Sequence, residues 1–218
     1  MKYSENYSTI LELTGLFKGI KFQEIQSMLN CLGSKIQNIK KGGIILLSGD
    51  RLEYIGIVLS GILHITRENY DGNRSVLAVI KQGGVFAEAL CCAGITESPV
   101  TVIAAEDSCV MKLSFTRILK TCSSSCLFHT KLIENMAGLI AKKNLMLQSK
   151  MEILELKTIR EKVMRYLETF NARNITLPFN REEMADFLRV ERSALSHELT
   201  KMKKDGLLDY KMNKFTLL

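Results

Sequence analysis

The chain has 218 residues, of which 46% are hydrophobic, so it can form the core of one large domain or two small ones. Its formal net charge of +7 favours a polyanionic partner such as nucleic acid. No stretch approaches the roughly 18 consecutive apolar residues of a transmembrane helix, and the N-terminal residues lack the pattern of a secretory signal. We therefore expect a cytoplasmic protein with no membrane partner, whose six cysteines form no disulfide framework.

The N-terminal half shows one short helical pattern followed by a β-rich region. Residues 21–32 have helical spacing, with these apolar residues on one face: Phe22, Ile25, Met28 and Leu29. From Gly33 to about Leu113, short β-type runs are broken by Gly and Asp, and the run YIGIVLSGILHIT is interrupted at Gly56 and Gly61. Strong turn signals occur at Asp71-Gly72 and Gly83-Gly84. The pattern predicts a β-roll of the jelly-roll type, which we assign to an effector-sensing domain of residues 1–116.

A long helical pattern follows at about residues 125–155, which contain no proline and one glycine. Apolar residues recur there every seven residues, as in a coiled-coil seam. The predicted dimer interface consists of Ile133, Ala137, Ile140, Asn144, Leu147, Met151 and Leu154. A second stripe is expected to pack against the β-roll: Leu132, Met136, Leu139 and Met146. We predict a dimerisation helix within residues 117–156; a single buried core helix is the alternative.

The C-terminal part predicts a winged helix-turn-helix within residues 157–218. Three shorter helical segments occur at about residues 158–172, 181–188 and 192–204. Asn180 followed by Glu183 predicts an N-cap with a capping box for the middle one. The chain ends in two short strand patterns around Met212-Asn213, which predict a β-wing. With the β-roll and the long helix, this gives an α+β fold.

The segment at residues 192–204 separates into a polar and an apolar face. At about 100° per residue, its hydrogen-bond donors fall within one arc of roughly 140°. The candidate DNA-binding residues on this face are Arg192, Ser193, Ser196, His197, Thr200 and Lys203. Arginine can bond O6 and N7 of guanine, and lysine suits phosphate contacts. A helix pair whose second helix presents such a face is typical of a helix-turn-helix.

The charge of this C-terminal part agrees with DNA binding, although two positions fit poorly. Residues 157–218 hold 13 Lys and Arg against 9 Asp and Glu, a net charge of +4. Arg189 lies in the turn, where glycine suits a left-handed backbone. Glu191 precedes the last helix, where Ser or Thr would cap better.

From about Leu16 to Leu218 the chain resembles the Crp/Fnr family of bacterial transcription regulators. The stretches KKGGIILLSGD, YIGIVLSGILHI and GGVFAEAL are similar to the family's cyclic-nucleotide-binding-like effector domain. The stretch LPFNREEMADFLRVERSALSHELTKMKKDGLL is similar to its winged helix-turn-helix. The resemblance implies a homodimer that binds palindromic double-stranded DNA, acts with RNA polymerase, and relays a signal from its N-terminal domain through the long helix. Base-reading positions of the family fall on Arg192, Ser193, Ser196 and His197, the last of which is usually Arg.

The resemblance also locates an effector pocket. Its residues would be Phe86, Ala87, Glu88, Ala89, Leu90, Ser98, Pro99, Val100, Thr101, Met136 and Leu139. Members that bind cyclic nucleotides hold the phosphate with a Gly-Glu stretch and an Arg-Ser pair; here these positions read Ala87-Glu88 and Ser98-Pro99. A buried phosphate without a cation is unfavourable by several kcal/mol, so we expect no cyclic AMP binding. Three options stay open: a small apolar or aromatic effector, no effector, or thiol chemistry at Cys91, Cys92, Cys122 or Cys126.

Other function classes receive less support from the sequence. The chain has no G-x-S-x-G, no phosphate-binding glycine loop and no H-E-x-x-H, so we expect no enzyme, no catalytic residues, no metal site and no cofactor. Only Cys31 lies near the N-terminus, which argues against an iron–sulfur cluster, and His64 and His129 are isolated candidates for haem ligation. Arg189 and Glu191 leave one alternative open: a ligand-binding or redox-sensing dimer with weak or lost specific DNA binding.

Overall fold

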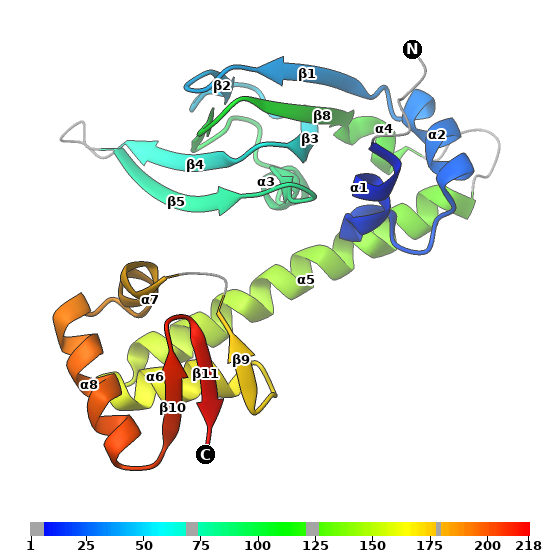
Figure 1. Ribbon diagram of the computed structural model, residues 1–218. Coiled ribbons are helices and arrows are strands. Elements are labelled where there is room, and N and C mark those ends of the chain that lie inside the picture. The colour runs from blue at the N-terminus through cyan, green and yellow to red at the C-terminus, as the bar shows by residue number, and fades with distance from the viewer. Residues whose placement is uncertain (1–6, 69–73, 121–126, 178–179) are drawn as a thin grey trace. The chain divides into compact units, whose positions relative to one another are not determined.

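The computed structural model describes residues 7–68, 74–120, 127–177 and 180–218 (Figure 1). The chain divides into two compact units, residues 1–142 and 143–218, which we describe separately. Antiparallel sheets, a long helix and a C-terminal helix-turn-helix give the predicted α+β fold. No helix in the described ranges is both long and apolar enough to cross a membrane.

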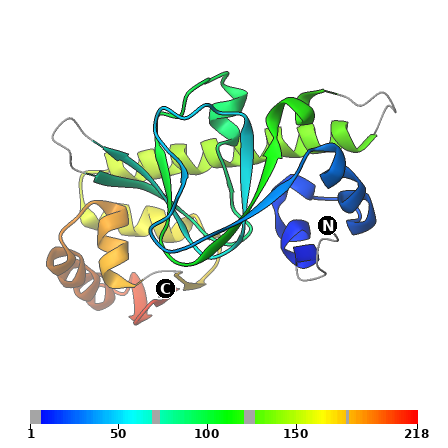
Figure 2. The same ribbon diagram turned by 90° about the horizontal axis from the view of Figure 1, so that it is seen from above.

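The first unit contains two four-stranded antiparallel sheets that curl around a common interior (Figure 2). The first sheet has the order β1-β8-β3-β6, formed by Lys35–Ile39, Ser108–Ser114, Tyr54–Ser60 and Val85–Phe86. The second has the order β2-β7-β4-β5, formed by Ile44–Leu46, Thr101–Ala104, Leu63–Glu68 and Arg74–Ile80. Aliphatic side chains from both sheets, including Val58, Val102 and Val110, form a buried cluster between them. This is the predicted β-roll.

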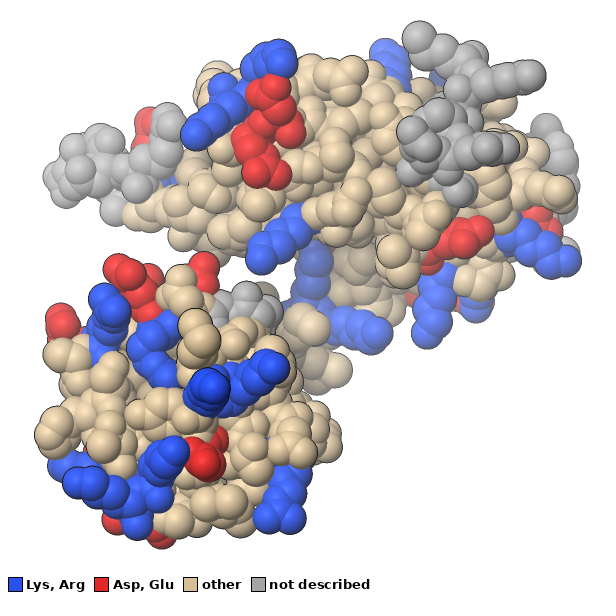
Figure 3. Space-filling model, in the orientation of Figure 1, with Lys and Arg blue, Asp and Glu red and all other residues tan. Residues whose placement is uncertain are grey.

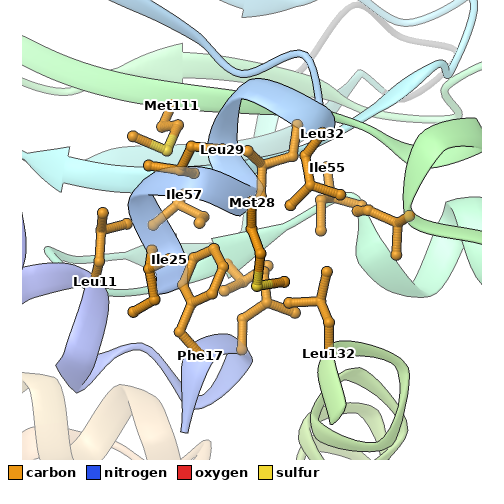
Figure 4. Close-up of a cluster of buried hydrophobic side chains, with 14 of the residues drawn as sticks. Leu11, Phe17, Ile25, Met28, Leu29, Leu32, Ile55, Ile57, Met111 and Leu132 are labelled. Carbon is orange, nitrogen blue, oxygen red and sulfur yellow. The ribbon is translucent and has the colours of Figure 1, made fainter. Parts of the chain in front are cut away.

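The other face of the first sheet is covered by helices. Ile57 and Met111, which alternate with the interior residues, belong to a second buried cluster. Its helical members come from α1 (Ser8–Leu13), the 3₁₀ turn η2 (Gly15–Phe17), α2 (Phe22–Cys31), α4 (Phe115–Leu119) and α5 (Leu127–Glu155). Figure 4 shows Leu132 of α5 reaching into this cluster. The predicted helix at residues 21–32 is therefore confirmed as α2, with Ile25, Met28 and Leu29 buried.

Two glycines of the roll behave differently from each other. Gly61 adopts φ 85° and ends β3, as the sequence predicts. Gly56 was expected to interrupt the run but lies inside β3. A Cβ at this position would meet Cζ of Phe86 at 2.0 Å, so the glycine leaves space for the Phe86 ring. Gly83 forms the expected turn with φ 78°, whereas the turn predicted at Asp71-Gly72 lies outside the described residues.

Helix α5 contributes to both units. Leu132 and Met136 are buried against the first unit and Leu139 is half-buried, as predicted. Met146, which was expected on the same stripe, belongs to the second unit and is exposed there, so its packing against the β-roll stays a prediction. At 1.5 Å per residue it lies about 21 Å along the helix from Leu132, and the heptad pattern cannot tell how far the cluster extends.

The second unit is a winged helix-turn-helix, as predicted. Its helices are α6 (Ile159–Glu168), α7 (Arg181–Leu188) and α8 (Arg192–Lys204). Its sheet has the order β10-β11-β9, formed by Leu208–Lys211, Lys214–Leu217 and Asn174–Thr176. The buried core joins Ile153 of α5 to Leu199 of α8 and Phe215 of the wing. Strand β9 was missed by the sequence analysis, and α6 ends four residues before the predicted end of its segment.

Candidate nucleic-acid interface

Helix α7 begins at the predicted capping box. Oδ1 of Asn180 accepts hydrogen bonds from the backbone N–H groups of Glu182 and Glu183, at 2.9 and 3.0 Å. Oε2 of Glu183 accepts in return from the backbone N–H of Asn180 at 2.7 Å. These bonds satisfy first-turn donors and fix where the helix starts.

The turn between α7 and α8 has the left-handed backbone that glycine usually supplies. Arg189 adopts φ 52° and ψ 55°, and the next N–H, of Val190, donates to the carbonyl of Ala185 at 3.0 Å. A non-glycine residue in this conformation costs about 1 kcal/mol. The turn nevertheless forms, so the sequence mismatch at Arg189 does not remove the helix-turn-helix.

Helix α8 buries one face and presents the other to solvent. Leu195, Leu199 and Met202 are fully buried in the core of the second unit. The residues predicted to bind DNA are all exposed: Arg192, Ser193, Ser196, His197, Thr200 and Lys203. The side chain of Glu191 makes no capping hydrogen bond at the start of the helix. The exposed face is therefore rich in donors.

Two carboxylates fix α8 to α6 through one arginine. Nε of Arg160 lies 2.7 Å from Oε1 of Glu198, and Nη2 lies 2.6 Å from Oδ2 of Asp205. The hydrogen bond to Glu198, followed by the one to Asp205, raises the pKa of Arg160. The orientation of α8 therefore depends on polar contacts as well as on its buried face.

The wing brings an acidic residue to the exposed face, which the sequence analysis did not foresee. Asp209 of β10 forms an ion pair with Lys203, and its Oδ1 also accepts from the N–H of Tyr210 at 2.6 Å. The hydrogen bond from Lys203, with that from the Tyr210 backbone, lowers the pKa of Asp209. The ammonium of Lys203 is therefore already paired with a carboxylate of the same chain, that of Asp209.

A second basic residue joins α7 to the wing. The guanidinium of Arg181 lies 4.9 Å from the ring centroid of Tyr210 and 5.3 Å from that of Phe215. Its Nη2 donates to the carbonyl of Met212 at 3.1 Å. Figure 3 shows several Lys and Arg side chains on the visible face of this unit. Neither the role of Arg181 nor the third wing strand was predicted, because both depend on contacts between distant segments.

The predicted dimer residues of α5 range from half-buried to exposed. Ile133, Ile140 and Leu154 are half-buried, and the first two pack partly against the core of the first unit. The other four positions of the seam are exposed: Ala137, Asn144, Leu147 and Met151. Leu147 is 62% exposed and Met151 61%, and their apolar neighbours Leu145 and Met146 are exposed as well.

The predicted effector residues gather around helix α3 (Glu88–Cys92) and the start of β7. Those that are buried are Phe86, Glu88, Ser98, Val100, Thr101 and Met136. Ala87, Leu90 and Leu139 are half-buried, and Ala89 and Pro99 are exposed. Ala87 precedes α3 as its N-cap residue in a left-handed conformation, with φ 65°, which glycine adopts more readily than alanine.

Both hydrogen-bond donors of Ser98 are already used. Its hydroxyl donates to the carbonyl of Val100 at 2.7 Å, and its N–H donates to the carbonyl of Asp50 at 2.8 Å. Pro99, which follows, has no N–H to offer. The segment that would hold a cyclic phosphate therefore lacks both a cation and a free donor at Ser98.

The thiols near this segment are not activated. Burial, followed by the charges of Cys92 and Glu88, raises the pKa of Cys91 to about 11. Burial and then Glu88 also raise the pKa of Cys92. Because the thiolate is the reactive form, neither environment favours thiol chemistry at neutral pH. Cys122 and Cys126 lie outside the described residues.

The described residues include no group of His, Cys, Asp and Glu that could hold a metal ion. His129 is 1% exposed, and neither ring nitrogen has a hydrogen-bond partner in the described structure. His64 is half-buried in β4. Nothing brings these two histidines together into one site.

Comparison with known proteins agrees with this division of the chain. Residues 36–125 match the cyclic nucleotide-binding domain family, and residues 153–218 match the Crp-like helix-turn-helix domain family. No curated protein matches the chain in sequence.

Solved structures resemble the chain over most of its length. The c-di-GMP responsive global regulator CLP of Xanthomonas campestris is 18% identical, with 88% of this chain and 97% of that chain covered and a TM-score of 0.58. DNR from Pseudomonas aeruginosa is 19% identical, with coverages of 100% and 96% and a TM-score of 0.52. The Thermus thermophilus Catabolite Activator Protein is 19% identical, with 94% of both chains covered and a TM-score of 0.51. At these identities the likeness shows the fold.

Proposed function

Because the chain belongs to the Crp/Fnr family of bacterial transcription regulators, we propose that it is a homodimer that binds a palindromic site in double-stranded DNA. It is a regulator with a sensor domain and a helix-turn-helix domain. We propose that the protein acts in the bacterial cytoplasm, where its DNA target lies. We also propose RNA polymerase as a further partner. We propose the domain limits 1–116, 117–156 and 157–218.

One observation carries the proposed mode of DNA binding, namely the exposed donor face of α8 opposite its buried face. The major groove admits an α-helix, and residues near the N-terminus of a recognition helix reach base edges. We propose that Arg192, at the first position of α8, contacts a guanine. Ser193, Ser196 and His197 extend the base-reading face, and Thr200 and Lys203 contact phosphates.

Dimerisation is supported by the exposed apolar side chains of α5. Leu147 and Met151 are each more than half exposed, which is unfavourable in water unless another surface covers them. They lie four residues apart, at the two alternating positions of the predicted seam, and Asn144 precedes Leu147 by three residues, as in a parallel two-stranded coiled coil. The same helix in a second copy would cover both residues. A homodimer also supplies the two half-sites of a palindrome.

We propose that the β-roll senses a signal other than cyclic AMP, through the segments around α3 and β7 with Met136 and Leu139. The lack of a cation at Ser98-Pro99 and the use of both Ser98 donors support this proposal. Calorimetry with cyclic AMP and cyclic GMP tests it. Micromolar binding of either nucleotide would overturn it, because the phosphate would then have another counter-charge.

The experiment that tests the DNA-binding proposal is selection of bound sites from random duplex DNA with the full-length chain, repeated with and without cell extract. We expect recovered sites with two symmetric half-sites about one helical turn apart. Recovery of sequences with no preference would contradict the proposal and favour a dimer without specific DNA binding. Dependence on the extract would indicate a required effector.

A further inference from the structure

A basic groove of the first unit is formed by residues of the first sheet and of α4. It has a volume of about 580 Å³ and is lined by Lys35 and Gln37 of β1, Tyr54 of β3, Lys112 of β8 and Arg117 of α4. Ligand sites typically occupy 300–1,000 Å³, so the groove has the size for a small molecule. None of these residues belongs to a site predicted from the sequence.

The strand register places two of the cations together. Lys35 of β1 lies directly opposite Lys112 of β8 in the antiparallel pair. Both therefore project from the same face of the first sheet, which is the face that carries Val110 and Ile39 into the roll interior. Like charges directly opposite each other in a sheet are destabilising. The fold thus tolerates an unfavourable pair at this point.

Arg117 adds a third cation from α4. Its Nη1 donates to the carbonyl of Cys31 at 3.4 Å, and the guanidinium lies beside Gly33 at the start of the groove. In the described parts of the chain, no ion pair engages Arg117, Lys35 or Lys112. Glu53 also lines the groove, but its carboxylate pairs with Nε of Arg51 at 3.1 Å.

Lys112 is held in place although it has no carboxylate partner in the described structure. Its Nζ lies 4.3 Å from the ring centroid of Tyr54 and 3.4 Å from the carbonyl oxygen of Ile45. The hydroxyl of Tyr54 donates to the same carbonyl at 2.9 Å, so ring and ammonium are fixed together. Burial lowers the pKa of Lys112, and the charge of Asp50 opposes this only in part. An anion in the groove would stabilise the charged form of Lys112, which burial disfavours.

We propose that this groove binds a small phosphorylated organic anion, with Lys112 as the recessed contact and Lys35 and Arg117 at the rim. A compact phosphate can reach the half-buried ammonium of Lys112. A flat protein surface would instead contact mainly Lys35 and Arg117 at the rim of the groove. Phosphate contacts from lysine and arginine are charge-assisted and therefore strong. Tyr54 offers apolar surface for the organic part. The proposal does not depend on DNA binding by the second unit.

The test is calorimetric titration of the full-length chain with ADP and with inorganic pyrophosphate, at physiological ionic strength. We expect saturable binding of ADP, and a loss of affinity of at least about tenfold in Lys112→Met, which keeps the aliphatic stem. Arg117→Gln should lower affinity as well, and it serves if Lys112→Met fails to fold by circular dichroism. Lys81→Gln changes an exposed lysine outside the groove and should bind as the unmodified chain does.

Two further measurements separate this site from other anion-binding surfaces. Lys204→Gln removes an exposed lysine at the C-terminal end of α8 and should leave ADP binding unchanged; a loss there would place the anion on the second unit and overturn the proposal. The last measurement is a titration with a hexaglutamate peptide. Binding of the peptide but of neither phosphate probe would overturn the proposal and assign the groove to an acidic protein segment. Absence of binding by all three at millimolar concentration would overturn it also.

Discussion

Nε of Arg160 lies 2.7 Å from Oε1 of Glu198, so the first turn of α6 holds the middle of α8. The same guanidinium reaches Asp205 at the C-terminal end of α8. The two contacts are spaced along one helix and therefore restrict its rotation against α6. A base-reading face needs this kind of support, because small displacements of a positioned side chain weaken directional hydrogen bonds.

Arg160→Gln should lower affinity for the selected DNA site by about tenfold, with a small change in melting temperature, because exposed ion pairs contribute little to stability. The expected loss arises from a less ordered α8. Fluorescence anisotropy with labelled duplex measures it. Arg165→Gln is the matched control, since the ion pairs of Arg165 in the described structure are with Glu152 and Glu168, which lie outside α8. An equal loss in both variants would mean that charge alone matters.

Arg192→Ala should weaken binding to the selected site by about 1–3 kcal/mol and relax the preference at one position of each half-site. Lys203→Ala should instead weaken binding to selected and random duplexes alike, because a phosphate contact carries no sequence information. Binding to both duplexes is measured at several salt concentrations. If Arg192→Ala reduces binding to both duplexes equally, Arg192 contacts the backbone and does not read a base.

Asp209→Asn should raise DNA affinity on any sequence. The ion pair lowers the pKa of Asp209 below its unfolded value, so its stabilising effect is present above pH of about 4 and is lost as the pH falls through the folded pKa. At neutral pH the pair is therefore formed, and Lys203 must give up Asp209 to bind a phosphate. Removing the carboxylate should steepen the salt dependence by up to about one phosphate contact. Unchanged affinity would show that Lys203 does not approach DNA.

Local rules predicted the elements of the DNA-binding unit well. The capping box at Asn180 and the buried face of α8 follow from residue types a few positions apart, and both are confirmed. The pairing of Lys203 with Asp209 could not be predicted in this way, because the register of the wing brings them together. The groove at Lys112 was missed for the same reason, since Lys35 lies far away in the sequence.

Leu147→Glu should convert the proposed dimer to monomers. Leu147 is 62% exposed in the single chain, so the change leaves the fold of each unit intact, whereas Ile140 also packs against the first core. A carboxylate at the seam would be buried without a partner, and we expect the dissociation constant to rise at least about a hundredfold. Sedimentation equilibrium at micromolar concentration measures this. Gln148→Glu adds the same charge beside the seam and should remain dimeric; a dimeric Leu147→Glu would contradict the assigned interface.

Ala87→Gly should stabilise the first unit. Ala87 adopts φ 65°, where a Cβ is unfavourable, and glycine relieves this strain, for an expected gain of about 0.5–1 kcal/mol in the free energy of unfolding. The matched control is Ala89→Gly, two residues later inside α3, which should lose about 0.5–1 kcal/mol because glycine is unfavourable in a helix. Urea unfolding of both variants gives the comparison. If both variants are destabilised alike, the left-handed conformation at Ala87 carries no strain, and the alanine at this position has no energetic cost to the fold.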